Sequence, residues 1–201
     1  MRRHFTALLA LAALPVAADE PEKRDMSVAE VIYQEVACQP QRPTANRSSP
    51  YDSTVITVGG RRALICYGRP SARGRTMIGG TAVPYGKLWR TGANEPTTLH
   101  IPFAAEIAGV KVTPGSYSIY TIPGEKEWHV IVNRSTTQWG HEGRYTEEVK
   151  AQEVGHGIAP ASKLEDHVEM FTIRSQPATG GADLILEWEH TRVAVPIRAA
   201  K

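Results

Sequence analysis

The chain has little cysteine, no long apolar run and few of the motifs by which enzymes are usually recognised. Its only cysteines, Cys38 and Cys66, lack the CxxC spacing of a redox motif. No apolar run reaches the roughly 20 residues that a membrane-spanning helix needs, so we predict no transmembrane segment. A nucleophile elbow, a phosphate loop and a dinucleotide fingerprint are also absent. These absences leave no local motif that names a reaction.

The chain also lacks a surplus of charge. Its 201 residues hold 23 Lys and Arg against 21 Asp and Glu. Two of the arginines, Arg2 and Arg3, lie in residues 1–18, which carry no acidic residue, so 21 of each sign remain in the rest. Because interspersed charges of equal number give no long-range field, we predict no nucleic-acid partner.

The first 18 residues have the pattern of a cleavable signal peptide. The basic start Arg2-Arg3-His4 is followed by an apolar stretch and by the small residues Val16-Ala17-Ala18, just before Asp19. We therefore expect an exported protein, periplasmic or extracellular. Because Arg2-Arg3 with Phe5 also resembles a twin-arginine signal, both export routes stay open.

Export would affect the oxidation state of the two cysteines. In an oxidising compartment Cys38 and Cys66 predict one disulfide, which would close a loop of 28 residues and contribute roughly 3–4 kcal/mol by chain entropy. Spacing alone does not exclude the alternative, two buried free thiols.

The remainder of the chain predicts a short helical segment and one domain. Ser27-Val28-Ala29-Glu30 has the form of a capping box, and residues 39–50 are rich in Pro, Arg, Asn and Ser. We assign residues 19–48 to a short helix and an extended arm, and residues 49–201 to a single β domain. No internal repeat or second domain is visible.

Period-two patterns and turn residues predict many short strands. Gly59-Gly60 predicts a tight hairpin, and we expect residues 183–189 and 192–197 to form a final hairpin. Residues 140–163 are the least readable; within them residues 145–154 fit either a helix or an edge strand, and we favour the strand. The other predicted strands are residues 54–58, 61–67, 97–103, 110–112, 116–122, 128–133 and 168–174. This spacing favours an all-β antiparallel sandwich or a jelly-roll-like barrel.

The densest unusual segment spans residues 68–98. It contains Gly68-Arg69, then Pro84-Tyr85-Gly86, then Trp89-Arg90-Thr91-Gly92-Ala93-Asn94-Glu95. This run resembles the hallmark of the bacterial family called domain of unknown function 2911. The resemblance continues through Ile122-Pro123-Gly124-Glu125-Lys126-Glu127-Trp128 and Gln138-Trp139-Gly140, and covers roughly residues 49–198. It implies an exported β domain and carries no established activity.

Two interpretations of this hallmark segment stay open. In the first, its polar side chains converge at one end of the sandwich, where guanidinium groups hold an anion and Glu95 is available as a general base. In the second, Arg90 and Glu95 are a buried ion pair that fixes a long loop. The candidate ligand-binding residues of the first interpretation are Arg69, Arg75, Trp89, Arg90, Asn94 and Glu95.

The tryptophans and histidines give no clear indication of a binding or metal site. Trp188 lies in a strand with core alternation, whereas Trp89, Trp128 and Trp139 are open to two interpretations, core packing or stacking on a sugar. No pair of histidines has the spacing of a helical zinc site, and we predict neither a metal nor a cofactor.

The leading functional hypothesis is non-catalytic binding of a small polar or anionic ligand, of the sugar, carboxylate or phosphate type. One alternative is a hydrolase or lyase that uses Glu95 as acid or base. A second alternative is a structural or interaction domain of the cell envelope. The sequence leaves the oligomeric state open.

Overall fold

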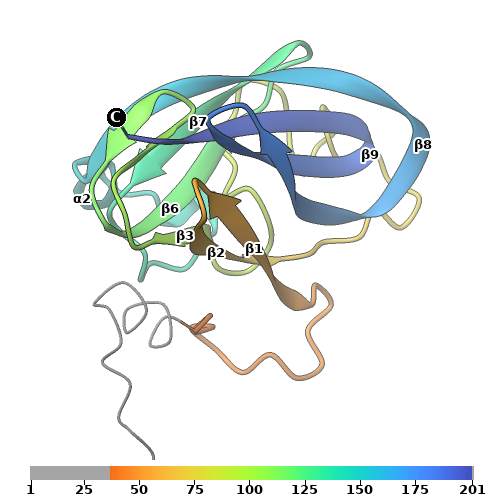
Figure 1. Ribbon diagram of the computed structural model, residues 1–201. Coiled ribbons are helices and arrows are strands. Elements are labelled where there is room, and N and C mark those ends of the chain that lie inside the picture. The colour runs from red at the N-terminus through yellow and green to blue at the C-terminus, as the bar shows by residue number, and fades with distance from the viewer. Residues whose placement is uncertain (1–36, 201) are drawn as a thin grey trace, which may run out of the picture.

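The computed structural model describes residues 37–200 and is built almost entirely of antiparallel strands (Figure 1). The predicted signal peptide and the helix predicted from residue 27 lie outside the described residues. The strands are β1 (Tyr51–Val58), β2 (Arg61–Gly68), β3 (Thr97–Ile101), β4 (Ala105–Ile107), β5 (Val110–Val112), β6 (Gly115–Ile122), β7 (Glu127–Asn133), β8 (Glu153–Ala178) and β9 (Gly181–Ala199). The all-β class predicted from the sequence is confirmed.

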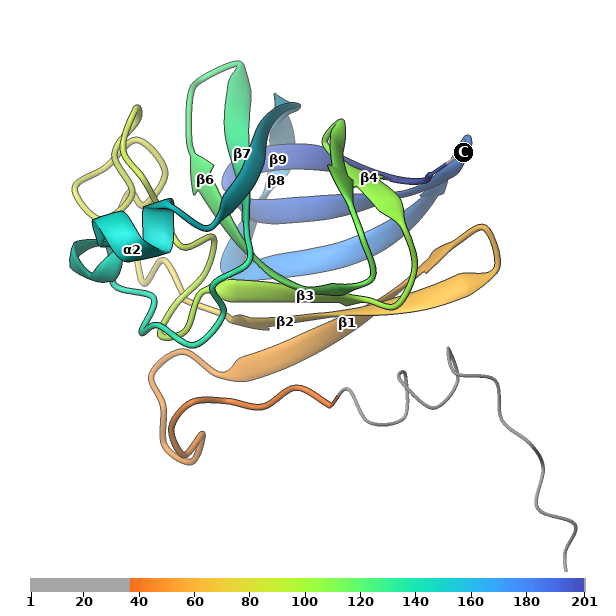
Figure 2. The ribbon, with the colours of Figure 1, turned by 90° about the vertical axis from the view of Figure 1, so that its left-hand side faces the viewer.

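The strands form two layers that share β8. Their order is β1-β2-β3-β6-β7-β8-β9-β4-β5. The first part of β8 pairs with β7 and the later part pairs with β9, so β8 runs from one layer into the other. Figure 2 shows β1, β2 and β3 beneath β8 and β9. Among the described residues β1 and β5 have no ladder between them, so the structure is an open sandwich.

The hairpin of β1 and β2 has the predicted turn. Val58 pairs with Arg61, which leaves Gly59 and Gly60 as the two turn residues, with φ of 57° and 77°. A two-residue turn of this kind needs positive φ at both positions, which glycine adopts without a steric penalty.

Aromatic rings dominate the core between the layers. The ring of Trp89 lies 5.2 Å from that of Phe171 and 5.9 Å from those of Trp128 and Trp188. The three tryptophans are at most 3% exposed. The core position predicted for Trp188 is confirmed, and Trp89 and Trp128 pack beside it.

The predicted final hairpin is wrong. Residues 183–189 and 192–197 belong to one strand, β9, whose main partner is β8. Glu189 has a φ of 52°, which bends β9 without reversing its direction. A bend between two alternating segments has the same sequence pattern as a hairpin, which explains the error.

The strand predicted for residues 145–154 is also wrong over most of its length. A short helix, α2 (Glu147–Lys150), follows the 3₁₀ turn η1 (Glu142–Arg144), and β8 begins only at Glu153. Acidic residues in the first turn of α2 and Lys150 in its last turn suit the helix dipole. Val149 is buried and anchors the helix.

The β8–β9 ladder is interrupted where both strands bend. Lys163 pairs with Thr191 and Val168 pairs with Glu189, so four residues of β8, 164–167, lie opposite His190 alone. Bulges of this kind redirect side chains and are frequent beside functional sites. We call residues 164–167 the β8 bulge.

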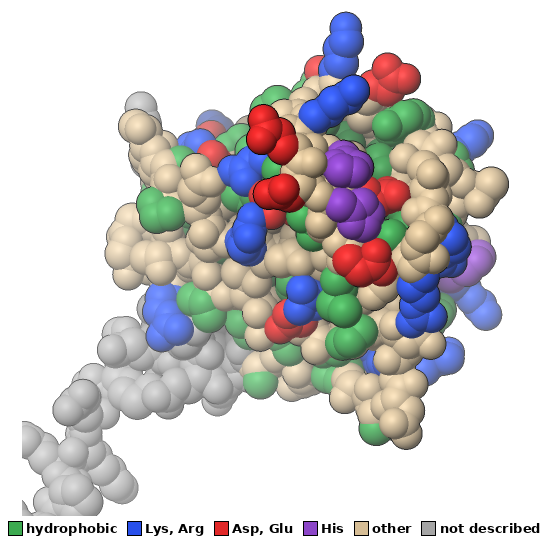
Figure 3. Space-filling view, turned by 90° about the vertical axis from the view of Figure 1, so that its right-hand side faces the viewer, with side chains coloured by type: hydrophobic (Ala, Val, Ile, Leu, Met, Phe, Trp, Pro, Cys, Tyr) green, Lys and Arg blue, Asp and Glu red, His purple; other side chains and the backbone are tan. Residues whose placement is uncertain are grey.

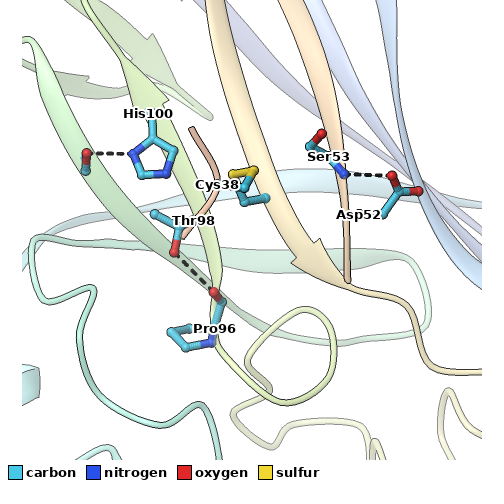
Figure 4. The surroundings of a disulfide bond; sticks show 8 residues. Cys38, Asp52, Ser53, Pro96, Thr98 and His100 are labelled. Atoms are coloured by element: carbon cyan, nitrogen blue, oxygen red, sulfur yellow. Dashed lines mark hydrogen bonds between the residues drawn. A yellow bond between two sulfur atoms is a disulfide. The ribbon is translucent and has the colours of Figure 1, made fainter. Parts of the chain in front are cut away.

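The predicted disulfide between Cys38 and Cys66 is present, with a Cα–Cα distance of 5.7 Å. It ties the arm, residues 37–50, to β2 on the outer face of the sheet, beside Thr98 and His100 (Figure 4). No helix within residues 37–200 is long and apolar enough to cross a membrane.

Replacing both cysteines (Cys38→Ser with Cys66→Ser) is expected to lower the free energy of unfolding by roughly 3–4 kcal/mol, because the unfolded chain regains the freedom of a 28-residue loop. Urea denaturation measures the change. Reduction of the wild-type protein should give the same shift, and an unchanged midpoint in both cases would contradict the prediction.

Candidate functional site

The hallmark loop, residues 69–96, connects β2 to β3 and packs tightly against β6. Trp89 exchanges two backbone hydrogen bonds with Thr121, of 2.7 and 2.8 Å. Thr91, which is fully buried at a φ of 57°, donates its hydroxyl to that of Thr121 at 3.0 Å. Thr97 donates to the carbonyl of Thr91 at 2.6 Å. The buried backbone groups of Trp89 and Thr91 thus find hydrogen-bond partners on β6 and at the start of β3.

Glu95 is held in a buried ion pair with the arm. Both of its carboxylate oxygens accept hydrogen bonds from Arg47, at 2.7 and 2.8 Å, and the backbone N–H of Gln41 donates at 2.9 Å. The Glu95 side chain is 5% exposed. Burial by itself raises the pKa of Glu95, but the Arg47 hydrogen bonds and charge outweigh it, so the pKa is lowered. A carboxylate in this state does not fit the role of general acid or base.

Arg90 does not pair with Glu95. Its Nη1 donates to Glu142, at 2.9 and 3.0 Å, at the end of the sandwich where the hallmark loop meets α2 (Figure 2). Gly140 lies between these segments, because a Cβ there would be 2.6 Å from Arg90 Cδ and 2.6 Å from the Asn94 carbonyl oxygen. Arg90 and Glu95, which one interpretation of the sequence paired with each other, therefore have different partners. Arg90 holds the turn at Glu142 against the hallmark loop, and Glu95 holds the arm.

The other candidate residues also bond within the chain. Arg69 pairs with Asp52 at 3.0 Å, and Arg75 donates to the carbonyls of Ala72 and Ser71. The Asn94 amide donates to the carbonyl of Ser49 at 3.3 Å, and Trp89 lies in the core. The structure gives each of the three guanidinium groups a separate set of partners.

The arm is fixed at several points by these and neighbouring residues. The Gln41 amide donates to the carbonyl of Gln138 at 2.8 Å. The Arg42 guanidinium lies 4.0 Å from the ring centre of Trp139, and Arg73 donates to the carbonyl of Ser48. Trp139 is thus covered by the arm on one face.

A cleft lies elsewhere, at the end of the molecule where β8 and β9 bend. Its volume is about 830 Å³, within the range of small-molecule sites. We call it the bulge cleft, because Leu164 of the β8 bulge, the three residues of β8 before it and the facing part of β9 form one wall. Its lining residues are Tyr85, Gly124, Glu125, Lys126, Ala161, Ser162, Lys163, Leu164, His190 and Thr191. Figure 3 shows this end, with two adjacent histidines among charged side chains of both signs.

The charged groups of the bulge cleft are exposed. Lys126 and Lys163 have neither an ion pair nor a hydrogen bond from their ammonium groups within residues 37–200. His190 Nδ1 lies 3.2 Å from the carbonyl oxygen of Leu164, so Nδ1 donates and Nε2 is left for another partner. The ring of His167 lies 5.3 Å from that of His190.

Residues 49–197 match the family described as "Protein of unknown function (DUF2911)". The chain belongs to the DUF2911 family. The match covers nearly all of the described structure and confirms the resemblance noted in the sequence. No curated protein and no solved structure matches the chain.

Two segments that carry the DUF2911 resemblance meet at the bulge cleft. The backbone N–H of Gly86 donates to the carbonyl of Pro123 at 2.8 Å, which places Pro84-Tyr85-Gly86 against the turn that holds Gly124 and Lys126. Sequence reasoning assigned no role to Lys163 or His190. No local pattern marks them, because the first half of β8 shows no alternation and its pairing depends on a distant partner strand.

Glu95→Gln is expected to lower the free energy of unfolding by about 3 kcal/mol, because it leaves the Arg47 charge buried without its partner. Chemical denaturation measures this. The matched control is Asp52→Asn, which breaks the more exposed, half-buried pair with Arg69 and should cost less, about 1 kcal/mol. Equal effects of the two substitutions would contradict the assignment.

The stability gained from Glu95 should also depend on pH. Because the pKa of Glu95 is lower in the folded protein than its ordinary value of 4.5, the stabilisation is present above that value and is lost as the pH falls further. The difference in stability between wild type and Glu95→Gln should therefore be constant near neutral pH and shrink below pH 4.5. Denaturation curves across this range test it, and a constant difference down to acid pH would argue against it.

Proposed function

We propose that this domain binds a small anionic ligand, of the carboxylate or phosphate type, in the bulge cleft, without catalysing a reaction. The observation that carries the proposal is the placement of Lys126 and Lys163, both without partners in the described part of the chain, on one cleft of about 830 Å³.

The chemistry of the cleft supports an anion that also carries hydroxyl groups. Among the lining residues two ammonium groups outnumber the single carboxylate of Glu125, so the charge of the lining favours an anion. The hydroxyls of Tyr85 and Thr191 are available to donate and accept hydrogen bonds, whereas Ser162 Oγ donates to the carbonyl of Arg192 at 3.5 Å and is available as an acceptor. Glu125 is suited to accept from a ligand hydroxyl and to select against ligands that carry only negative groups.

The exposure of the charged groups supports reversible binding. Ammonium groups in contact with water attract an anion through a high dielectric, so their contribution to affinity is modest and falls with salt. The DUF2911 hallmark loop contributes Tyr85 to this cleft, whereas its arginines and Glu95 hold the scaffold. The signal-peptide pattern, together with the disulfide, supports a ligand found outside the cytoplasm.

Lys126→Ala and Lys163→Ala are each expected to weaken the binding of an anionic ligand about tenfold, because each removes a charge-assisted hydrogen bond. Isothermal titration with inorganic phosphate, citrate, succinate and glucuronate measures this at low and high salt. Binding of one or more of these anions, weaker at high salt, is the expected result.

The matched control is Lys111→Ala, which removes an exposed lysine of β5 that does not line the cleft. Its affinity should equal that of the wild-type protein. The proposal fails if none of these anions binds, or if Lys111→Ala weakens binding as much as the cleft substitutions do.

A further inference from the structure

A second cleft lies on the outer face of the sheet, between the arm and β3 and β6. Its volume is about 460 Å³. We call it the arm cleft, and its lining residues are Ala37, Gln39, Pro40, Gln41, Tyr51, Thr98, His100, Ser116, Thr136 and Thr137. Figure 4 shows Thr98 and His100 on β3 beside Cys38 of the arm. The arm cleft and the bulge cleft share no lining residue.

The arm cleft differs from the bulge cleft in its chemistry. None of its ten lining residues is Asp, Glu, Lys or Arg. Five of them carry a hydroxyl group and two carry a side-chain amide. Some of these groups are already engaged, because Thr98 Oγ1 donates to the carbonyl of Pro96 at 3.2 Å and the Gln41 amide donates to the carbonyls of Thr136 and Gln138. Their oxygens remain as acceptors, and the lining has no charge to balance an ionic ligand.

His100 and Ser116 form the floor of the arm cleft. They are partners in the β3–β6 register, and His100 Nδ1 lies 2.7 Å from Ser116 Oγ. Burial lowers the pKa of His100, which favours the neutral imidazole. A neutral imidazole bonded to a hydroxyl both donates and accepts, as the hydroxyls of a sugar do.

The walls of the arm cleft are held in place before any ligand arrives. The arm is tied to β2 by the disulfide, and the backbone of Gln41 is bonded to the buried Glu95. The Gln41 amide also donates to the carbonyl of Thr136 on the opposite wall, at 3.3 Å. A preformed site loses little conformational entropy on binding.

We infer that the arm cleft is a binding site for a neutral polyhydroxylated ligand, a sugar ring or a disaccharide. The inference rests on the uncharged, hydroxyl-rich lining, on the fixed pair of His100 and Ser116, and on a volume suited to one or two sugar rings. It is independent of the function proposed for the bulge cleft.

The test is an NMR titration of the isotope-labelled protein with glucose, N-acetylglucosamine, trehalose and, as the charged comparison, glucuronate. The expected result is a shift of the backbone amides of Thr98, His100, Ser116 and Thr136 with one or more neutral sugars. Ser116→Ala and Thr98→Val should each weaken that sugar about fivefold, because each removes one neutral hydrogen bond. Both positions are at least partly exposed, and circular dichroism checks that the variants fold.

The variant Lys126→Ala with Lys163→Ala serves as the control, because it changes the bulge cleft alone. It should bind neutral sugars as tightly as the wild-type protein does. The inference is overturned if no neutral sugar shifts these amides at millimolar concentration. It is also overturned if glucuronate shifts them as strongly as the neutral sugars do, or if folded Ser116→Ala and Thr98→Val bind unchanged. None of these results depends on whether the bulge cleft binds an anion.

Discussion

The long ladder between β8 and β9 is the constraint on which the rest of the structure depends. Because β8 pairs with β7 at one end and with β9 at the other, a single strand belongs to both layers and must bend between them. The bend is accommodated by the β8 bulge and by the positive φ of Glu189. The bulge cleft lies where the ladder is interrupted: Ala161, Ser162 and Lys163 are the last β8 residues paired with β9 before the bulge, and Leu164 is the first displaced residue. Beyond the bulge, Phe171 and Trp188 return to the core around Trp89.

The position of the arm depends on a second, separate set of interactions. It packs on the outer face of the sheet, where it has few apolar contacts to hold it, and its position is set by the disulfide and by the pair of Arg47 with Glu95. The ion pair is favourable because the guanidinium meets the carboxylate with two hydrogen bonds and Gln41 supplies a third. These two fastenings, 9 residues apart at Cys38 and Arg47, fix the stretch of chain that forms one wall of the arm cleft.

How far the sequence could predict the structure depends on how local each signal is. The turn at Gly59-Gly60 and the alternation around Trp188 are set by neighbouring residues, and both were predicted correctly. The first half of β8 was missed, because its outer residues are exposed and its polar sequence shows no alternation. The partner of Arg90 could not be predicted, because Glu142 lies 52 positions away. It also lies in a segment whose secondary structure the sequence does not indicate clearly. The segment containing Arg90 and Glu95 carries the DUF2911 resemblance, which is confirmed, but no sequence pattern marks the residues that line the bulge cleft, because they come from distant parts of the chain.

Arginine and lysine residues of this chain differ in the partners that they have within it. A guanidinium group has five donors in a plane, so it satisfies several carbonyl and carboxylate oxygens at once. Arg47 and Arg75 do this with backbone carbonyls of their own segments, and Arg69 does it with the carbonyl of Phe171 in β8. A lysine offers a point charge on a flexible stem and makes a weaker structural fastening. The cations of the bulge cleft are lysines, which leaves their charge available to an external anion. In this domain, therefore, the arginines of the hallmark loop hold segments of the chain together, and the anion site that we propose rests on the two lysines that have no partner within residues 37–200.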